Sequence, residues 1–183
     1  MRAVKAGRPT WIDYALDQLK ASLEESGLAE FLGADVTLAP VPRSAPLSSP
    51  SALWPSRVIC SGLLSRGLAA AVNPCLSRIE TVQRSSAAGR GERPDADEHL
   101  RTIAIKPEIL TTRRVTIVDD VVTIGRTILA AASHVSAAHP GVDVRAFGLI
   151  HTLGMGREIT GIAEPYVGRL VRRGRFIAHD PER

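Results

Sequence analysis

The chain is poor in lysine and cysteine and lacks any long hydrophobic run. Only Lys5, Lys20 and Lys106 are lysines. No apolar run approaches the length of a membrane span, so we expect no membrane-spanning helix. The basic N-terminus lacks an apolar segment, which argues against a secretory signal. Cys60 and Cys75 have no Cys or His cluster nearby, so we expect buried thiols of a cytoplasmic protein rather than a disulfide or a zinc site.

The remaining composition favours one compact folded domain with an excess of arginine. The chain has 183 residues, of which 44% are hydrophobic, so it can bury a sizeable core. Its net charge is +4, with a sequence pI of about 9.6, and nearly all of the basic residues are arginine. A GC-rich genome would favour arginine codons, but affinity for a polyanion gives the same pattern. A small diphosphate ligand and a nucleic acid both satisfy this charge, so charge alone does not choose between them.

Residues 115–127, VTIVDDVVTIGRT, predict a strand, a polar tip and a helix start in that order. The β-branched segment Val115 to Val118 ends in two adjacent carboxylates, Asp119 and Asp120. About four residues of turn follow, and an apolar helix begins near Thr127. Such a turn offers backbone N–H groups, two threonine hydroxyls and the positive end of a helix dipole, which together suit a phosphate dianion. The carboxylates stand where they could bind sugar hydroxyls or Mg²⁺.

This run resembles the PRPP motif of type I phosphoribosyltransferases, where PRPP is 5-phosphoribosyl 1-diphosphate. The motif has four hydrophobic residues, two acids, two hydrophobic residues and then Thr-x-Gly-x-Thr. The resemblance implies that Asp119 and Asp120 are the catalytic acids, which contact the ribose hydroxyls and bind Mg²⁺. Ile124 stands where many members have Thr or Ala, and backbone N–H donation survives that change. The residues implied to bind the 5′-phosphate are Thr123, Ile124, Gly125, Arg126 and Thr127.

A second loop, from Pro40 to Pro50, follows a predicted strand at 35–39 and is stiffened by proline. Its Pro-Val-Pro start is similar to that of ComF-type members of the family, which are associated with DNA uptake and processing. In the family the corresponding loop contacts the diphosphate, which by position implies Arg43 and Ser44 here. The alternative is a surface turn with an incidental arginine.

The stretch from Cys75 to Arg101 is polar and lacks sustained apolar periodicity, so most of it is expected to be a mobile loop. Its Leu-x-Arg followed by Gln is also similar to ComF-type proteins, and family members use a flexible loop here to close over PRPP. Arg78 and Arg84 are the implied diphosphate ligands, although a solvated linker would carry such arginines too. His99 lies among acids in a spacing that does not match a metal site, and we expect it at the surface.

Five further elements are predicted around the motif. In the first helix we expect Trp11 and Tyr14 to pack against the sheet rather than to stack on bases. The strand at 102–106 is expected to pair near the central strand. Strand, helix and strand in succession imply a right-handed crossover and a parallel sheet. The predicted elements are a helix at 10–32, a helix at 51–67, the strand at 102–106, a helix at 127–138 and a strand at 142–150.

We therefore expect an α/β protein with a type I phosphoribosyltransferase fold, in which helices flank a mostly parallel sheet beneath a small hood. One domain would span 1–183, with a core at about 35–152. The hood would come from the helix at 10–32, from the tail at 154–183, or from both. The expected function is transfer of phosphoribosyl from PRPP to a nitrogen nucleophile, with Mg²⁺ and release of diphosphate.

Other functions and two macromolecular partners stay open. The chain could be a non-catalytic PRPP- or nucleotide-binding regulator, or a ComF-like accessory protein in DNA transactions. A nucleic-acid-binding protein with a vestigial pocket is a third interpretation. Nucleic acid, or a second copy of the chain in a homodimer, are the macromolecular partners left open, and no membrane partner is expected.

Overall fold

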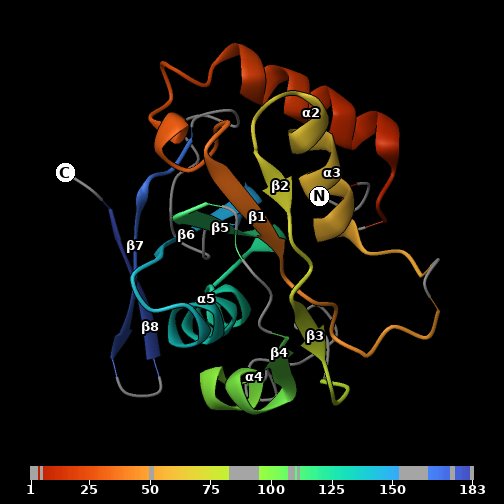
Figure 1. Cartoon of the computed structure of the whole chain (residues 1–183), viewed down its shortest axis with the longest axis vertical. Coiled ribbons are helices and arrows are strands. Elements are labelled where there is room, and N and C mark those ends of the chain that lie inside the picture. Colours follow the sequence, from red (N-terminus) through yellow and green to blue (C-terminus); the bar gives the residue numbers. More distant parts are fainter. Residues whose placement is uncertain are drawn as a thin grey trace.

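A parallel four-stranded sheet forms the centre of the molecule (Figure 1). The structure, a computed structural model, describes residues 4, 6–49, 52–82, 95–106, 110, 112–152, 165–173 and 176–181. The strands of the sheet are β1 (Val36–Pro40), β2 (Ala71–Val72), β5 (Arg114–Val122) and β6 (Asp143–His151). Their order is β2-β1-β5-β6, and each neighbouring pair is parallel. The predicted α/β class is therefore confirmed.

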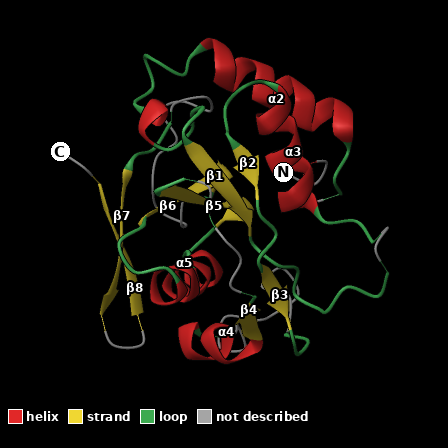
Figure 2. Ribbon diagram, viewed as in Figure 1, coloured by secondary structure: helices red, strands yellow, loops and turns green. Residues whose placement is uncertain are grey.

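Helices cover both faces of this sheet (Figure 2). Helices α2 (Pro9–Ala21) and α3 (Pro55–Ser65) lie on one face and α5 (Arg126–Ala138) lies on the other, while α4 (Ala96–Thr102) packs on α5 and η1 (Leu28–Glu30) is a short 3₁₀ helix. Leu16 of α2 and Ile59 of α3 share one buried cluster with Leu38 of β1. Ile128 of α5 shares a second cluster with Ile117 of β5. A sheet covered on both faces needs nearly continuous apolar strands, which explains why every residue of β1 is buried.

The N-terminal helix differs from its prediction in length and in the face that it buries. It ends at Ala21 and does not reach residue 32, because the hydroxyls of Ser22 and Ser26 donate to nearby backbone carbonyls and favour turns there. The buried stripe runs through Ile12 and Leu16 rather than through the aromatics. Trp11 and Tyr14 are 58% and 62% exposed, so the expectation that they pack against the sheet is wrong.

Helix α3 and the motif elements lie close to their predicted positions. Helix α3 begins at Pro55, later than predicted, because proline fits the first helical turn where no N–H is needed. Helix α5 and strand β6 begin within one residue of the predicted 127 and 142. Cys60 and Cys75 are buried thiols, as predicted.

The stretch from residue 75 to 106 contains more regular structure than predicted. Strands β3 (Leu76–Arg78) and β4 (Ile103–Ile105) pair with each other, antiparallel, in a separate two-stranded sheet. The expectation that 102–106 pairs near the central strand is therefore wrong. Helix α4 ends directly before β4, so the residues of α4 form a helix where a mobile loop was expected. Residues 83–94, where the closing loop was expected, lie outside the described residues.

The C-terminal tail forms a second antiparallel pair, β7 (Gly168–Arg173) with β8 (Phe176–Pro181). This pair lies beside α5 at one side of the molecule (Figure 1). No helix in the described ranges is both long and apolar enough to cross a membrane.

Candidate functional site

The candidate site lies at the carboxyl edge of the sheet, where β1 and β5 end side by side. Pro40 of β1 is the register partner of Val118 of β5, and the Val41 N–H donates to the Val118 carbonyl at 2.8 Å. Ligands bind at this edge of a parallel α/β sheet, because the loops and helix N-termini that follow the strands meet there. The loop after β1 and the turn after β5 are therefore neighbours.

The two acids lie inside β5 rather than at a tip after it. The strand continues to Val122, because pairing with β6 carries the ladder past the acids, so only part of the predicted turn is a turn. Asp119 Oδ1 accepts a hydrogen bond from the Asp120 N–H, and Asp120 Oδ1 accepts one from the Val121 N–H, both at 2.9 Å. Both acids are half-buried.

The five residues at 123–127 form the turn after β5 and the first turn of α5. Gly125 is the N-cap, with a φ of +86°, a backbone conformation that glycine adopts at little cost. A Cβ on Gly125 would lie 2.8 Å from Cδ1 of Leu170 in β7, so a larger residue there would have to displace that side chain. The first intrahelical bond runs from the Leu129 N–H to the Gly125 carbonyl at 2.9 Å, so earlier N–H groups face the helix N-terminus. That terminus, with its dipole, suits a phosphate.

Two hydrogen bonds to its backbone carbonyls hold the loop after β1. The Trp54 indole N–H donates to the Val41 carbonyl at 2.7 Å. The Val82 N–H donates to the Ser44 carbonyl, also at 2.7 Å. The side chains of Arg43 and Ser44 are half-buried. A loop fixed in this way would lose little conformational freedom when it binds a ligand.

Arg78 reaches this loop from β3 and is only 5% exposed. Its guanidinium donates from Nε to the Arg43 carbonyl at 3.0 Å and from Nη1 to Thr102 Oγ1 at 2.6 Å. Burial lowers the pKa of Arg78 to about 10, opposed by the carboxylates of Glu98 and Asp119, so the group stays charged at neutral pH. Arg78 thus supports the loop through protein contacts, and direct contact with a diphosphate stays a prediction. Arg84 lies outside the described residues.

His99 is the functional candidate that sequence reasoning placed wrongly. It is 4% exposed, not at the surface. Its Nδ1 lies 3.5 Å from Arg78 Nη2, and its Nε2 lies 3.3 Å from Thr127 Oγ1. Burial, together with the charges of Arg78 and Arg126, lowers the pKa of His99 to about 4. The ring is therefore neutral at neutral pH.

A sequence signal for the burial of His99 did exist. Asp95 caps α4, since its Oδ1 accepts the Glu98 N–H at 2.8 Å. Ala96, His99 and Thr102 then recur every third residue, and all three are buried. This helical spacing identifies an inward face, which the acids between these residues obscure.

The acid pair has the chemistry that Mg²⁺ prefers. Among the described residues, no group of three or more His, Cys, Asp or Glu side chains gathers as a metal site. Magnesium, however, is commonly bound by one or two carboxylates together with water and the phosphate oxygens of a ligand. Asp119 and Asp120 supply such carboxylate oxygens beside a predicted phosphate turn, so the residues present fit this ion.

A scan against protein-family models finds no match for the chain, and a search of curated proteins finds none either. The function is therefore inferred from the residues of the site.

Proposed function

We propose that this chain binds PRPP with Mg²⁺ and transfers its phosphoribosyl group to a nitrogen nucleophile, as a protein with a type I phosphoribosyltransferase fold. The observation that carries the proposal is the joining of two loops at one sheet edge. Asp119 and Asp120 lie in the last part of β5, shortly before the turn at 123–127, and the loop at 41–44 begins beside Val118 of the same strand. PRPP carries a phosphate at one end of its ribose and a diphosphate at the other, so it needs two such loops.

Each part of the ligand has a candidate partner. Thr123, Ile124, Gly125, Arg126 and Thr127 would bind the 5′-phosphate through N–H groups, hydroxyls and the helix dipole. Asp119 and Asp120 would accept hydrogen bonds from the ribose hydroxyls and hold Mg²⁺. The diphosphate would lie at Arg43 and Ser44, with Arg78 behind the loop and Arg84 as a further candidate.

The proposed reaction displaces diphosphate from C1 of the ribose by a nitrogen nucleophile, through a transition state with oxocarbenium character. The chain would contribute mainly by positioning the ribose and by placing cations near the leaving group. The buried charge of Arg78 supports this role, because it lies behind the backbone that would face the diphosphate. Bound Mg²⁺ would neutralise negative charge on the diphosphate.

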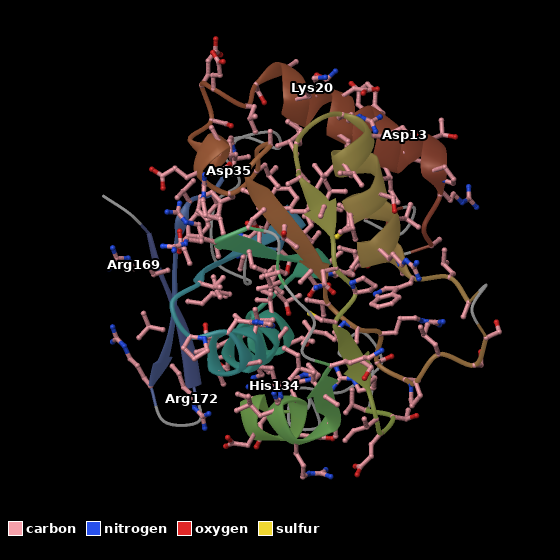
Figure 3. The ribbon with its side chains drawn as sticks, viewed as in Figure 1. Asp13, Lys20, Asp35, His134, Arg169 and Arg172 are labelled. Carbon is pink, nitrogen blue, oxygen red and sulfur yellow. The ribbon has the colours of Figure 1, made fainter. Side chains whose placement is uncertain are left out.

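We place the small hood in the C-terminal tail. Leu170 of β7 packs against Gly125, and Arg172 of the same strand forms a 2.7 Å ion pair with Asp97 of α4. Arg169 and Arg172 mark this strand in Figure 3. The rings of His151 and Tyr166 stack with centroids 4.9 Å apart, where β6 ends and the described tail begins. An acceptor that approaches from this side would meet the tail first.

A non-catalytic binder of PRPP or a nucleotide is the second candidate, and His99 favours it. The ring reaches the turn at 123–127, but each of its nitrogens contacts a protein side chain, and a pKa of about 4 makes it a weak base, so it is a poor candidate for a general base. A ComF-like accessory role in DNA transactions is a variant of this candidate, supported by the arginine excess.

A screen for diphosphate release separates these candidates. The wild-type protein would be mixed with PRPP and Mg²⁺ across a panel of nucleobases and amines. A transferase releases diphosphate only with a matching acceptor, whereas a binder shows PRPP affinity without acceptor-dependent release. Salt-sensitive DNA binding that PRPP does not compete, in a protein that does not bind PRPP, would contradict both.

A further inference from the structure

A chain of polar groups connects the loop after β1 with the turn after β5 through the interior. It begins at the Arg43 carbonyl, passes through Arg78 and His99, and ends at the Thr127 hydroxyl. Arg78 and His99 are almost completely buried, at 5% and 4% exposure. Buried polar groups are costly unless they are paired, so their placement between two loops needs a reason beyond filling space.

The chemistry of arginine fixes the direction of these hydrogen bonds. A guanidinium has only donors, so the contact between Arg78 Nη2 and His99 Nδ1 is attractive only if Nδ1 is unprotonated. In a neutral imidazole the proton is then on Nε2. That N–H points to Thr127 Oγ1, which must accept it.

The Thr102 hydroxyl follows the same assignment of donors and acceptors. Its hydroxyl accepts from Arg78 Nη1 at 2.6 Å and donates to the Glu98 carbonyl at 2.6 Å. A hydroxyl that accepts from a cationic donor thus turns its own proton to an acceptor on the other side. By analogy, Thr127 accepts from His99 and keeps its O–H for an acceptor beyond the turn.

We propose, on the basis of the proposed function, that His99 is a positioning residue. It fixes the Thr127 hydroxyl as a donor to the 5′-phosphate of the ligand, and Arg78 fixes the tautomer of His99. The consequence is selectivity for a ligand group that only accepts hydrogen bonds, as an ionised phosphate ester does. The lowered pKa of His99 agrees with the neutral ring that this arrangement needs.

The first test is the tautomer of His99 in the wild-type protein, which does not depend on any ligand. Long-range proton–nitrogen NMR of ¹⁵N-labelled protein at neutral pH distinguishes the two neutral forms and the charged form. The inference requires the proton on Nε2. A proton on Nδ1, or a charged ring, would overturn it.

The second test compares His99→Phe, which removes both contacts, with His99→Gln, which retains one acceptor and one donor. Calorimetry would measure affinity for ribose 5-phosphate and for diphosphate. His99→Phe should weaken ribose 5-phosphate binding about three- to tenfold, the effect of one hydrogen bond. Diphosphate binding should stay within about twofold, because Thr127 belongs to the other loop, and His99→Gln should restore most of the loss.

His134 offers a matched control on the same pair of helices. It lies on α5, labelled in Figure 3, and its Nε2 donates to the Leu100 carbonyl of α4 at 2.9 Å. His134→Phe removes a half-buried histidine contact between α4 and α5 without touching Thr127, so it should leave both affinities unchanged. Equal weakening by His134→Phe and His99→Phe would overturn the inference, since helix packing alone would then explain the loss.

Thr127→Val keeps the test open if His99→Phe does not fold. It should weaken ribose 5-phosphate binding at least as much, and it should leave diphosphate binding within about twofold, because the Thr127 hydroxyl belongs to the other loop. If His99→Phe or Thr127→Val binds ribose 5-phosphate as tightly as the wild type does, this inference is overturned and the proposed function is not. A wild type that binds neither ribose 5-phosphate nor diphosphate overturns the proposed function, and the inference with it.

Discussion

Arginine serves two different purposes at the two ends of the sheet. At the amino end, Arg114 pairs with Asp35 at 2.7 Å and Arg145 pairs with Glu30 at 2.6 Å (Asp35 is labelled in Figure 3). At the carboxyl edge, the hydrogen bonds of Arg78 go to a carbonyl, a hydroxyl and an imidazole, which are neutral groups.

The pKa shifts of these arginines run in opposite directions. The hydrogen bond to Glu30 raises the pKa of Arg145, whereas burial lowers the pKa of Arg78 to about 10. A cation beside a carboxylate has its charge cancelled locally. A cation held by neutral partners keeps its field, which falls on the loops where we propose that an anion binds. The arginines near the surface therefore form exposed ion pairs that add little stability, whereas Arg78 carries a buried charge that supports the fold and lies beside the proposed site.

The largest expected effect separates Arg78 from a surface arginine. Arg78→Met leaves the Arg43 carbonyl and the Thr102 hydroxyl without their buried donor and should destabilise the protein by roughly 2–4 kcal/mol. Arg101→Met is the control, since Arg101 and its partner Glu80 have side chains 63% and 57% exposed. Its loss should be about 0–1 kcal/mol. Denaturant unfolding measures both, and equal losses would remove the distinction between the two kinds of arginine.

The next prediction concerns the diphosphate loop. Arg43→Ala should weaken PRPP binding about ten- to a hundredfold, the effect of a charge-assisted contact, and should weaken ribose 5-phosphate binding much less. Arg57→Ala is the matched control, because Arg57 lies near this loop but over the Trp54 ring, 5.9 Å from its centroid. If Arg43→Ala weakens both ligands alike, or neither, the loop at 41–44 does not hold a diphosphate.

Two glycines with the same φ sharpen the comparison of the two sheet edges. Gly125 and Gly141 both have a φ of +86°, but only at Gly125 would a Cβ meet another atom, Leu170 Cδ1 at 2.8 Å. Gly141→Ala should cost roughly 1 kcal/mol, the cost of the backbone conformation. Gly125→Ala should cost about 1–2 kcal/mol more, since the side chain of Leu170 must move. Equal losses on thermal unfolding would mean that β7 does not pack on the phosphate turn.

The last of these predictions is a pH dependence of stability from His99. Its pKa is lowered from 6.5 to about 4 in the folded protein, so the unfolded chain binds the extra proton in that interval. Stability from this residue is therefore present above about pH 6.5 and is lost as the pH falls toward 4. His99→Phe should flatten the slope of unfolding free energy in this interval. If the slope of unfolding free energy against pH is the same in His99→Phe as in the wild type, the folded protein does not disfavour protonation of His99.

The sequence predicted the parts of the site whose signals are local. The run from Val115 to Thr127 carries its strand, acids, glycine and helix start in one segment, and the structure places β5 and α5 accordingly. The end of β5 was misplaced, because pairing with β6 depends on a partner far along the chain. A charged pair inside a strand is also contrary to ordinary strand propensity.

The parts that were missed depend on contacts between distant segments. Trp11 was expected to be buried because it begins a helical apolar stripe with Ala15 and Leu19, but the buried face of α2 runs through Ile12 and Leu16 instead. His99 was expected at the surface because acids surround it in sequence. The spacing of Ala96, His99 and Thr102 indicates an inward helical face, but it does not specify the partners of His99, which come from the packing of α4 on α5 and from Arg78 in β3.

The central claim is that the acids of β5 hold a PRPP–Mg²⁺ complex, and a calorimetric titration of PRPP with Mg²⁺ tests it directly. The wild type should bind, and Asp119→Asn with Asp120→Asn should abolish Mg²⁺-dependent binding while the unfolding transition is retained. The control is Asp13→Asn with Asp17→Asn, a second pair of carboxylates, on α2, whose exposed contacts go to Arg66. It should bind as the wild type does. Equal PRPP affinity in the Asp119 and Asp120 variant and the wild type would contradict the account.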